Sequence, residues 1–205
     1  MRQIARVFPF VCFFDLANGV TTFNIVLSFT MVVMVHQGEL SWAASIMCLA
    51  TMLDFIDGHI ARTWLAGDAP RRVFGKHLDS FSDLLNFSIA PAIALILLLP
   101  SSLAVIAGSA LVLSGVLRLA VFAINAPDAP AGYRGLPTTY SGLLFALAFQ
   151  SMAAHRLGAH DVLTLMFVIA LFQVTNLKFP KFKAVPTVAF IATAYPLCSF
   201  LLYNA

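Results

Sequence analysis

The sequence predicts an all-α fold, a polytopic transmembrane helical bundle with about seven spans and an N-terminal interfacial helix. Of its 205 residues, 60% are hydrophobic and only 10% are charged, whereas soluble domains average roughly 45–50% apolar and about 25% charged residues. The mean hydropathy is +0.92. Apolar stretches also recur at about the 20-residue length that a helix needs to cross a bilayer. We therefore expect an integral membrane protein with a single domain, residues 1–205.

Seven apolar stretches have the length of a membrane span. They cover residues 18–36, 40–65, 74–99, 102–125, 138–155, 160–177 and 185–203. Gly38 separates the first two, Pro100 separates the third from the fourth, and a segment containing Pro127 and Pro130 precedes the fifth. Gly158 separates the fifth from the sixth, since glycine and proline interrupt regular structure. The first fifteen residues are rich in phenylalanine and carry both charge signs, which is typical of an interfacial helix.

The basic residues predict the orientation of the bundle. If the N-terminus is cytoplasmic, every lysine and arginine except Arg156 falls on the cytoplasmic side or in that half of a span. An excess of lysine and arginine marks the cytoplasmic side of membrane proteins. We therefore expect the end of the second stretch and the start of the third to face the cytoplasm.

Four of the nine acidic residues lie within thirty residues of one another, in the second and third stretches. They are Asp54, Asp57, Asp79 and Asp83. Spacings of three and four residues place side chains on one helix face. Carboxylates inside a membrane protein are costly and need cations, protons or water as partners. Hard oxygen ligands suit Mg²⁺ or Mn²⁺, so the sequence predicts a divalent-cation site shared by two adjoining helices.

Small residues accompany these carboxylates. Gly58 and Ala61 share the helix face of the first two aspartates, and Arg62 follows them. Gly75 precedes the third aspartate by four residues, so a second helix carries a matching face. Residues with almost no side chain let a bulky or anionic ligand approach the backbone closely. The two faces together indicate a site that binds such a ligand beside the cations.

This arrangement resembles the signature of the CDP-alcohol phosphotransferases, membrane enzymes that transfer a phosphatidyl group from a CDP-linked lipid to an alcohol. The matching residues are Asp54, Asp57, Gly58, Ala61, Arg62, Gly75, Asp79 and Asp83. The resemblance implies two divalent cations held by the four aspartates, with Asp83 also acting as the general base. It further implies that the CDP-lipid is bound by Asp54, Gly58, Ala61, Arg62, Gly75 and Asp79.

Further segments are similar to the bacterial and archaeal phosphatidylserine synthases within that family. They are residues 78–92, 114–120, 133–137 and 174–183. This similarity implies CDP-diacylglycerol and L-serine as substrates, with phosphatidylserine and CMP as products. It also implies a homodimer in the inner or plasma membrane of a prokaryote, with the active site facing the cytoplasm and with lipids rather than nucleic acid as partners.

The acceptor alcohol stays open at this point. Arg118, an ionisable residue within a span, and Arg134, in a Gly-Leu-Pro loop, are candidate acceptor contacts. The same chemistry with an inositol phosphate, a glycerol phosphate or an amino alcohol is the alternative, because residues 121–123 and 138–140 depart from the usual pattern of the synthases. A divalent-cation transporter is a further alternative, although transport sites usually lie near the membrane midplane.

Overall fold

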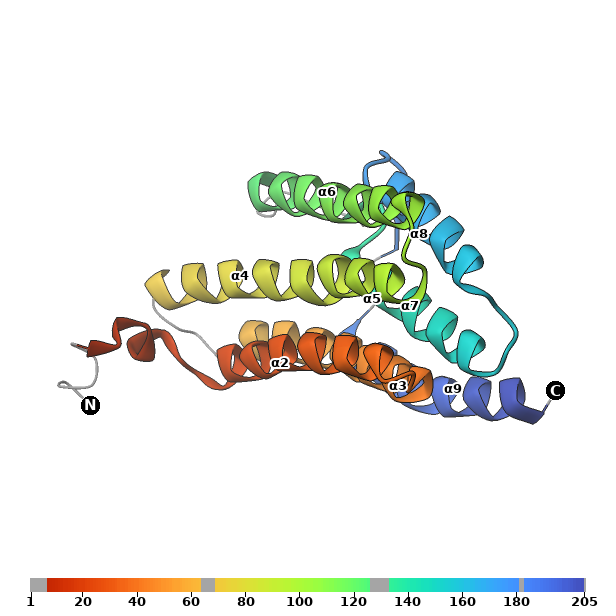
Figure 1. Ribbon diagram of the computed structural model, residues 1–205. Coiled ribbons are helices and arrows are strands. Elements are labelled where there is room, and N and C mark those ends of the chain that lie inside the picture. The colour runs from red at the N-terminus through yellow and green to blue at the C-terminus, as the bar shows by residue number, and fades with distance from the viewer. Residues whose placement is uncertain (1–6, 64–68, 126–132, 181–182, 205) are drawn as a thin grey trace.

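Helices lying side by side form almost the whole molecule (Figure 1). The computed structural model describes residues 7–63, 69–125, 133–180 and 183–204. The helices are η1 (a 3₁₀ helix, Pro9–Phe13), α2 (Leu16–His36), α3 (Leu40–Thr63), α4 (Ala69–Leu84), η2 (a π-helix, Leu85–Ile89), α5 (Ala90–Leu98), α6 (Ser102–Asn125), α7 (Thr138–Ala153), α8 (Ala159–Gln173) and α9 (Ala184–Asn204). Two short strands, β1 (Tyr133–Arg134) and β2 (Lys178–Phe179), pair antiparallel.

Each of the seven predicted stretches contains a helix, and the third consists of α4, η2 and α5 in succession. Within the described residues, five helical segments are long and apolar enough to cross a membrane. They are Leu16–His36, Leu40–Ala61, Pro70–Leu98, Ser102–Ile124 and Ala184–Asn204. Helices α7 and α8 are shorter, with 16 and 15 residues. The all-α membrane fold is therefore confirmed, and the count of about seven spans stays a prediction.

The described part of the N-terminal segment contains one short helix, η1, and residues 1–6 lie outside the described residues. The ring of Phe13 stacks on that of Phe74 in α4, with 5.3 Å between the ring centres. Helix α2 then begins at Leu16, because the Asp15 carboxylate caps it and accepts a hydrogen bond from the Asn18 backbone N–H at 2.9 Å. The interfacial position of this segment stays a prediction.

A π-helical turn directly follows the last aspartate of α4. In this turn the Ala90 N–H donates to the Leu85 carbonyl five residues earlier. Pro91 follows at once, and proline has no N–H and pushes against the carbonyl four residues before it. The wider turn accommodates the proline without ending the helix, so α4, η2 and α5 continue as one segment. Such turns occur frequently at functional sites, and the sequence analysis did not predict this one.

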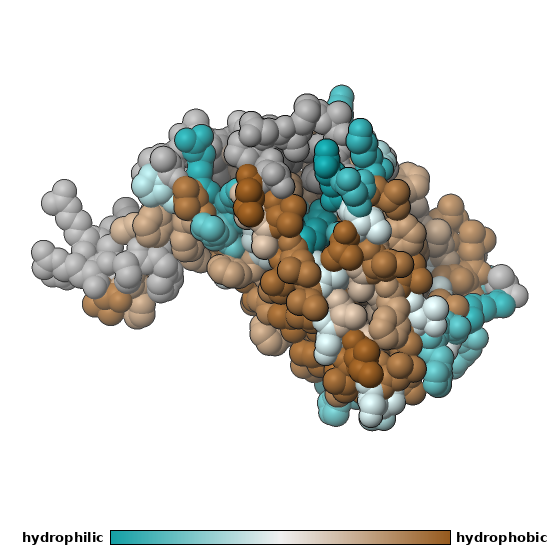
Figure 2. Space-filling view, turned by 90° about the horizontal axis from the view of Figure 1, so that it is seen from above, coloured by the Kyte–Doolittle hydropathy of each residue, from teal (hydrophilic) through white to brown (hydrophobic). Residues whose placement is uncertain are grey.

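Helix α3 packs against α2, α7 and α9, while α6 packs against α5 and α8. The buried core between them includes Met31, Met47, Phe87, Phe145 and Phe149. Many large apolar side chains are exposed on the outer faces of α2, α6 and α9, and apolar side chains cover most of the face seen in Figure 2. An apolar exterior of this kind agrees with contact to lipid rather than to water.

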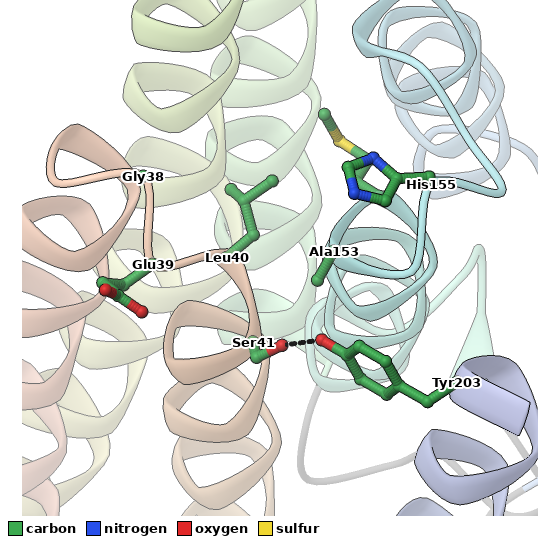
Figure 3. Close-up of a pocket in the computed structure, with 8 residues that line it drawn as sticks. Gly38, Glu39, Leu40, Ser41, Ala153, His155 and Tyr203 are labelled. Atoms are coloured by element: carbon green, nitrogen blue, oxygen red, sulfur yellow. Dashed lines mark hydrogen bonds between the residues drawn. The ribbon is translucent and has the colours of Figure 1, made fainter.

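The connection from α2 to α3 and the end of α7 enclose a cavity of about 310 Å³, which Tyr203 of α9 also lines (Figure 3). There the Ser41 and Tyr203 hydroxyl groups share a hydrogen bond. One turn further along α3, the hydroxyl oxygen of Ser45 lies 3.4 Å from that of Tyr195. These contacts attach α9 to α3. Because Ser41 lies in the first turn of α3, this cavity lies at the opposite end of α3 from Asp54 and Asp57.

Candidate metal and nucleotide site

The structure brings three of the predicted aspartates together. Asp54 and Asp57 lie near the end of α3, and Asp79 lies on α4. One carboxylate oxygen from each residue lies within 4.8 Å of the other two. Asp57 is almost fully buried, with 2% of its surface exposed. The two helix faces therefore meet, as the spacing of the aspartates predicts.

The fourth predicted aspartate, Asp83, lies one turn further along α4 and is not among the three carboxylates that meet within 4.8 Å, so its role as a cation ligand stays a prediction. Its carboxyl group interacts directly with that of Asp54. The Asp83 Oδ2 atom accepts a hydrogen bond from the Thr138 hydroxyl at 3.0 Å. The Asp83 Oδ1 atom is buried and accepts no hydrogen bond from the described residues. One oxygen of Asp83 is thus oriented by the protein, and the other is left for a ligand or a proton.

This donor set fits a divalent cation. The three carboxylates that meet within 4.8 Å, with the Asp83 carboxyl beside that of Asp54, repel one another unless a cation or protons neutralise them. Carboxylate oxygens are the ligands that Mg²⁺ and Mn²⁺ prefer. The buried Asp83 Oδ1 atom offers a further oxygen to such an ion. The arrangement can therefore hold a cation between α3 and α4.

Hydroxyl groups on two other helices hold the carboxylates. Thr21 of α2 donates to Asp57 Oδ2 at 2.6 Å, and Thr139 of α7 donates to Asp54 Oδ2 at 2.8 Å. From the sequence alone, Thr21 was given no role, and Thr139 was noted only as part of the unusual segment 138–140. The signal for Thr21 was present, because Asn18, Thr21 and Ser28 place polar groups on one face of an otherwise apolar span, and all three are buried.

A cavity of about 420 Å³ opens beside the aspartates, between α2, α3, α4 and α6. It is lined by Asp15, Ala17, Asn18, Thr21, Asp57, Gly58, Ala61, Arg71, Arg72, Gly75, Lys76, Asp79 and Phe122. Gly58, Ala61, Gly75 and Asp79 were predicted to bind nucleotide, and the structure places all four in this wall. The side chain of Arg62 lies outside the described part of the chain. The three basic residues of α4 bring positive charge to the cavity, which suits a phosphorylated ligand.

Gly75 shapes the cavity through a close approach of two helices. A Cβ atom at this position would lie 2.8 Å from Asn18 Oδ1. Asn18 is buried, and its Nδ2 atom donates to the Phe13 carbonyl at 2.7 Å. The glycine therefore lets α4 pack tightly on the start of α2, and this contact forms one wall of the cavity.

The two candidate acceptor residues have different surroundings. Arg118 of α6 is 9% exposed, and its Nη1 atom lies 3.5 Å from the Thr138 hydroxyl, which in turn contacts Asp83. Arg134 lies on β1, is exposed, and donates from Nη1 to Asn176 Oδ1 at 3.3 Å. The structure thus places Arg118 next to the aspartate cluster. For Arg134 it shows a contact at the surface loop, and a role for this residue in acceptor binding stays a prediction.

Replacing Thr21 with valine should weaken cation binding while preserving the shape of the side chain. The change removes the hydroxyl that fixes Asp57, and loss of an outer-shell partner typically costs about 10–100-fold in metal affinity. Mn²⁺ affinity, followed by electron paramagnetic resonance, measures the effect. Thr22→Val is the matched control, because the Thr22 hydroxyl donates to the Asn18 carbonyl of its own helix at 2.7 Å. Equal Mn²⁺ affinities for the two variants would contradict the role of Thr21.

The comparisons with known proteins all indicate the same enzyme family. A sequence model described as CDP-alcohol phosphatidyltransferase matches residues 14–200. A protein of Methanocaldococcus jannaschii named CDP-diacylglycerol–serine O-phosphatidyltransferase is 33% identical over 139 residues, which are 67% of this chain and 63% of that protein. A protein of Methanothermobacter thermautotrophicus named archaetidylserine synthase is 25% identical over 183 residues, 88% of this chain and 75% of that protein.

Proposed function

Because the chain belongs to the CDP-alcohol phosphatidyltransferase family, we propose that it transfers a phosphatidyl group from CDP-diacylglycerol to the hydroxyl of L-serine, giving phosphatidylserine and CMP. The observation that carries this proposal is the meeting of Asp54, Asp57 and Asp79 beside a cavity lined by small and basic residues. The names of both relatives specify serine as the acceptor, which supports the same acceptor here.

The proposed arrangement in the membrane has about seven passages, a single domain over residues 1–205 and an active site facing the cytoplasm of a prokaryotic cell. An odd number of passages is supported by the position of η1 and the end of α9 at opposite ends of the bundle (Figure 1). The cytoplasmic site is supported by Arg71, Arg72 and Lys76, which line the cavity, since basic residues favour the cytoplasmic side. A homodimer is part of the proposal on the basis of family resemblance alone.

In the proposed reaction, the CDP headgroup occupies the cavity while the lipid tails remain in the bilayer. Gly58, Ala61 and Gly75 leave room for the nucleotide, and the basic residues of α4 would bind its phosphates. Two divalent cations, Mg²⁺ or Mn²⁺, bound by the four aspartates would supply Lewis-acid stabilisation of the pyrophosphate and of the departing CMP.

The acceptor hydroxyl is proposed to approach Asp83, and the Asp83 carboxylate would accept its proton. A bond forms between the serine hydroxyl oxygen and the phosphorus that carries the diacylglycerol, and the bond from this phosphorus to the oxygen of CMP breaks. A positioned general base of this kind contributes about 10²–10⁴-fold to the rate. Arg118, buried next to Thr138 and Asp83, is positioned to bind the carboxylate of serine.

A product analysis tests the acceptor. The purified protein is supplied with CDP-diacylglycerol, Mn²⁺ or Mg²⁺, and labelled L-serine, glycerol phosphate, inositol phosphate or ethanolamine in separate reactions. We expect labelled phosphatidylserine and one CMP for each lipid formed, and loss of both products when the metal is chelated. Preferred labelling from a phosphorylated acceptor would contradict serine as the substrate, and metal-ion flux without CMP release would indicate a transporter instead.

A further inference from the structure

Helix α7 begins with two threonines that hold aspartates on two different helices. Thr138 donates to Asp83 Oδ2 at 3.0 Å, and Thr139 donates to Asp54 Oδ2 at 2.8 Å. Asp83 lies on α4 and Asp54 on α3. A single turn of α7 therefore contacts both sides of the carboxylate cluster.

The backbone that leads into α7 is fixed by the end of α8. The Leu136 N–H donates to the Phe172 carbonyl at 3.0 Å. Gly135 has a φ angle of +73°, and a Cβ atom at this position would lie 2.3 Å from the Gln173 carbonyl oxygen. The Gln173 side chain also donates from Nε2 to the Ser141 hydroxyl of α7 at 3.0 Å. These contacts hold the first turn of α7 in place, so its two hydroxyl groups are presented at fixed positions.

Arg118 also contacts the Thr138 hydroxyl group that donates to Asp83. Its Nη1 atom lies 3.5 Å from the Thr138 hydroxyl oxygen. A guanidinium group only donates hydrogen bonds, so the hydroxyl oxygen accepts from Arg118 and its one hydrogen is directed to Asp83. Thr138 is almost fully buried, with 1% of its surface exposed, which limits competition from water.

The orientation of these carboxylates matters for their chemistry. When Thr138 holds Asp83 Oδ2, the plane of the carboxylate is fixed and the direction of its buried Oδ1 atom is fixed with it. Thr139 restricts Asp54 in the same way. Groups that hydrogen-bond to metal ligands orient these ligands, and reacting groups need placement within about 0.5 Å of the productive geometry.

We propose that Thr138 and Thr139 are positioning residues, with Thr139 orienting Asp54 for cation binding and Thr138 orienting Asp83 toward the acceptor hydroxyl. The role of Thr138 toward Asp83 rests on the proposed function. The role of Thr139 toward Asp54 requires only that the carboxylate cluster binds a cation. Helix α7 thereby joins the loop at residues 133–137 and Arg118 to the carboxylate cluster.

Cation binding without substrate tests the role of Thr139. Thr139→Val removes the hydroxyl and keeps the branched shape, whereas Thr139→Ser keeps the hydroxyl. We expect the valine variant to bind Mn²⁺ about 10–100-fold more weakly in electron paramagnetic resonance titrations, and the serine variant to bind like the wild type. Thr51→Val is the control, since buried Thr51 donates to the Met47 carbonyl of its own helix at 2.9 Å.

Steady-state kinetics test the role of Thr138. Thr138→Val should lower kcat about 10–100-fold. The KM for CDP-diacylglycerol should stay unchanged, because Thr138 is not among the residues that line the cavity proposed to bind the nucleotide. Thr138→Ser should restore kcat. The melting temperatures of all variants are compared with that of the wild type, so that a loss of folding is separated from a loss of orientation.

The outcomes separate this proposal from the proposed function. Wild-type Mn²⁺ affinity in Thr139→Val or wild-type kcat in Thr138→Val would overturn the positioning role of that residue. A serine variant as defective as its valine counterpart would also overturn it. If the wild type transfers no lipid to serine while Thr139→Val still weakens Mn²⁺ binding, the proposed function fails and the role of Thr139 stands.

Discussion

Replacing Asp83 with asparagine should abolish measurable transfer while largely preserving CDP-lipid binding. The change keeps the size of the side chain but removes the carboxylate that would accept the acceptor proton, and a general base contributes about 10²–10⁴-fold to a rate. The cavity that would bind the nucleotide is lined by other residues, including Gly58, Gly75 and Asp79. Labelled phosphatidylserine formation gives the rate, and calorimetric titration with CDP-diacylglycerol in lipid nanodiscs gives the affinity.

Two results would count against the role of Asp83. A rate within a few-fold of the wild type would remove the assignment as general base, because the expected loss is at least about 100-fold. Loss of CDP-lipid binding together with a lower melting temperature would show that the residue is needed for folding. The predicted pattern is a folded protein that binds its lipid substrate and does not turn it over.

Replacing Asp57 with alanine should remove metal-dependent activity by weakening cation binding. Asp57 is buried, lies within 4.8 Å of Asp54 and Asp79 through its carboxylate, and is held by Thr21. Removing a ligand should cost more than the roughly 10–100-fold that follows loss of an outer-shell partner. The activity measured against increasing Mn²⁺ should therefore shift to concentrations more than about 100-fold higher, or fail to saturate.

A matched control for Asp57→Ala is Glu39→Ala at the opposite end of α3. This exposed carboxylate lines the cavity in Figure 3 and lies outside the aspartate cluster. Its loss changes the net charge by the same amount, so the Mn²⁺ dependence should stay as in the wild type. An unchanged Mn²⁺ titration in Asp57→Ala would contradict the role of Asp57 as a ligand.

The sequence predicted the helices well because their signal is strong and local. Apolar stretches of membrane-spanning length recur between turns at Gly38, Pro100 and Gly158, and each became a helix or a continuous run of helices. Two features of the fold could not be predicted from the sequence. The π-helix at residues 85–89 depends on how one helix accommodates Pro91, and the pairing of β1 with β2 depends on contacts between residues far apart in the chain.

The candidate site likewise has a part that the sequence predicted and a part that depends on how the helices pack. The spacing of Asp54, Asp57 and Asp79 predicted that two helix faces would meet, and the structure shows these carboxylates together. Thr138 and Thr139 could not be assigned, because their importance arises when α7 packs next to α3 and α4, more than fifty residues earlier in the sequence. The position of Arg118 beside Thr138 likewise depends on the packing of α6 against the rest of the bundle.

Anomalous X-ray diffraction from crystals grown with Mn²⁺ and CDP-diacylglycerol tests the central claim most directly, because the element-specific signal locates the cations. The account predicts two manganese peaks between α3 and α4, coordinated by Asp54, Asp57, Asp79 and Asp83. Manganese bound elsewhere, in protein that transfers phosphatidyl groups under the same conditions, would contradict it.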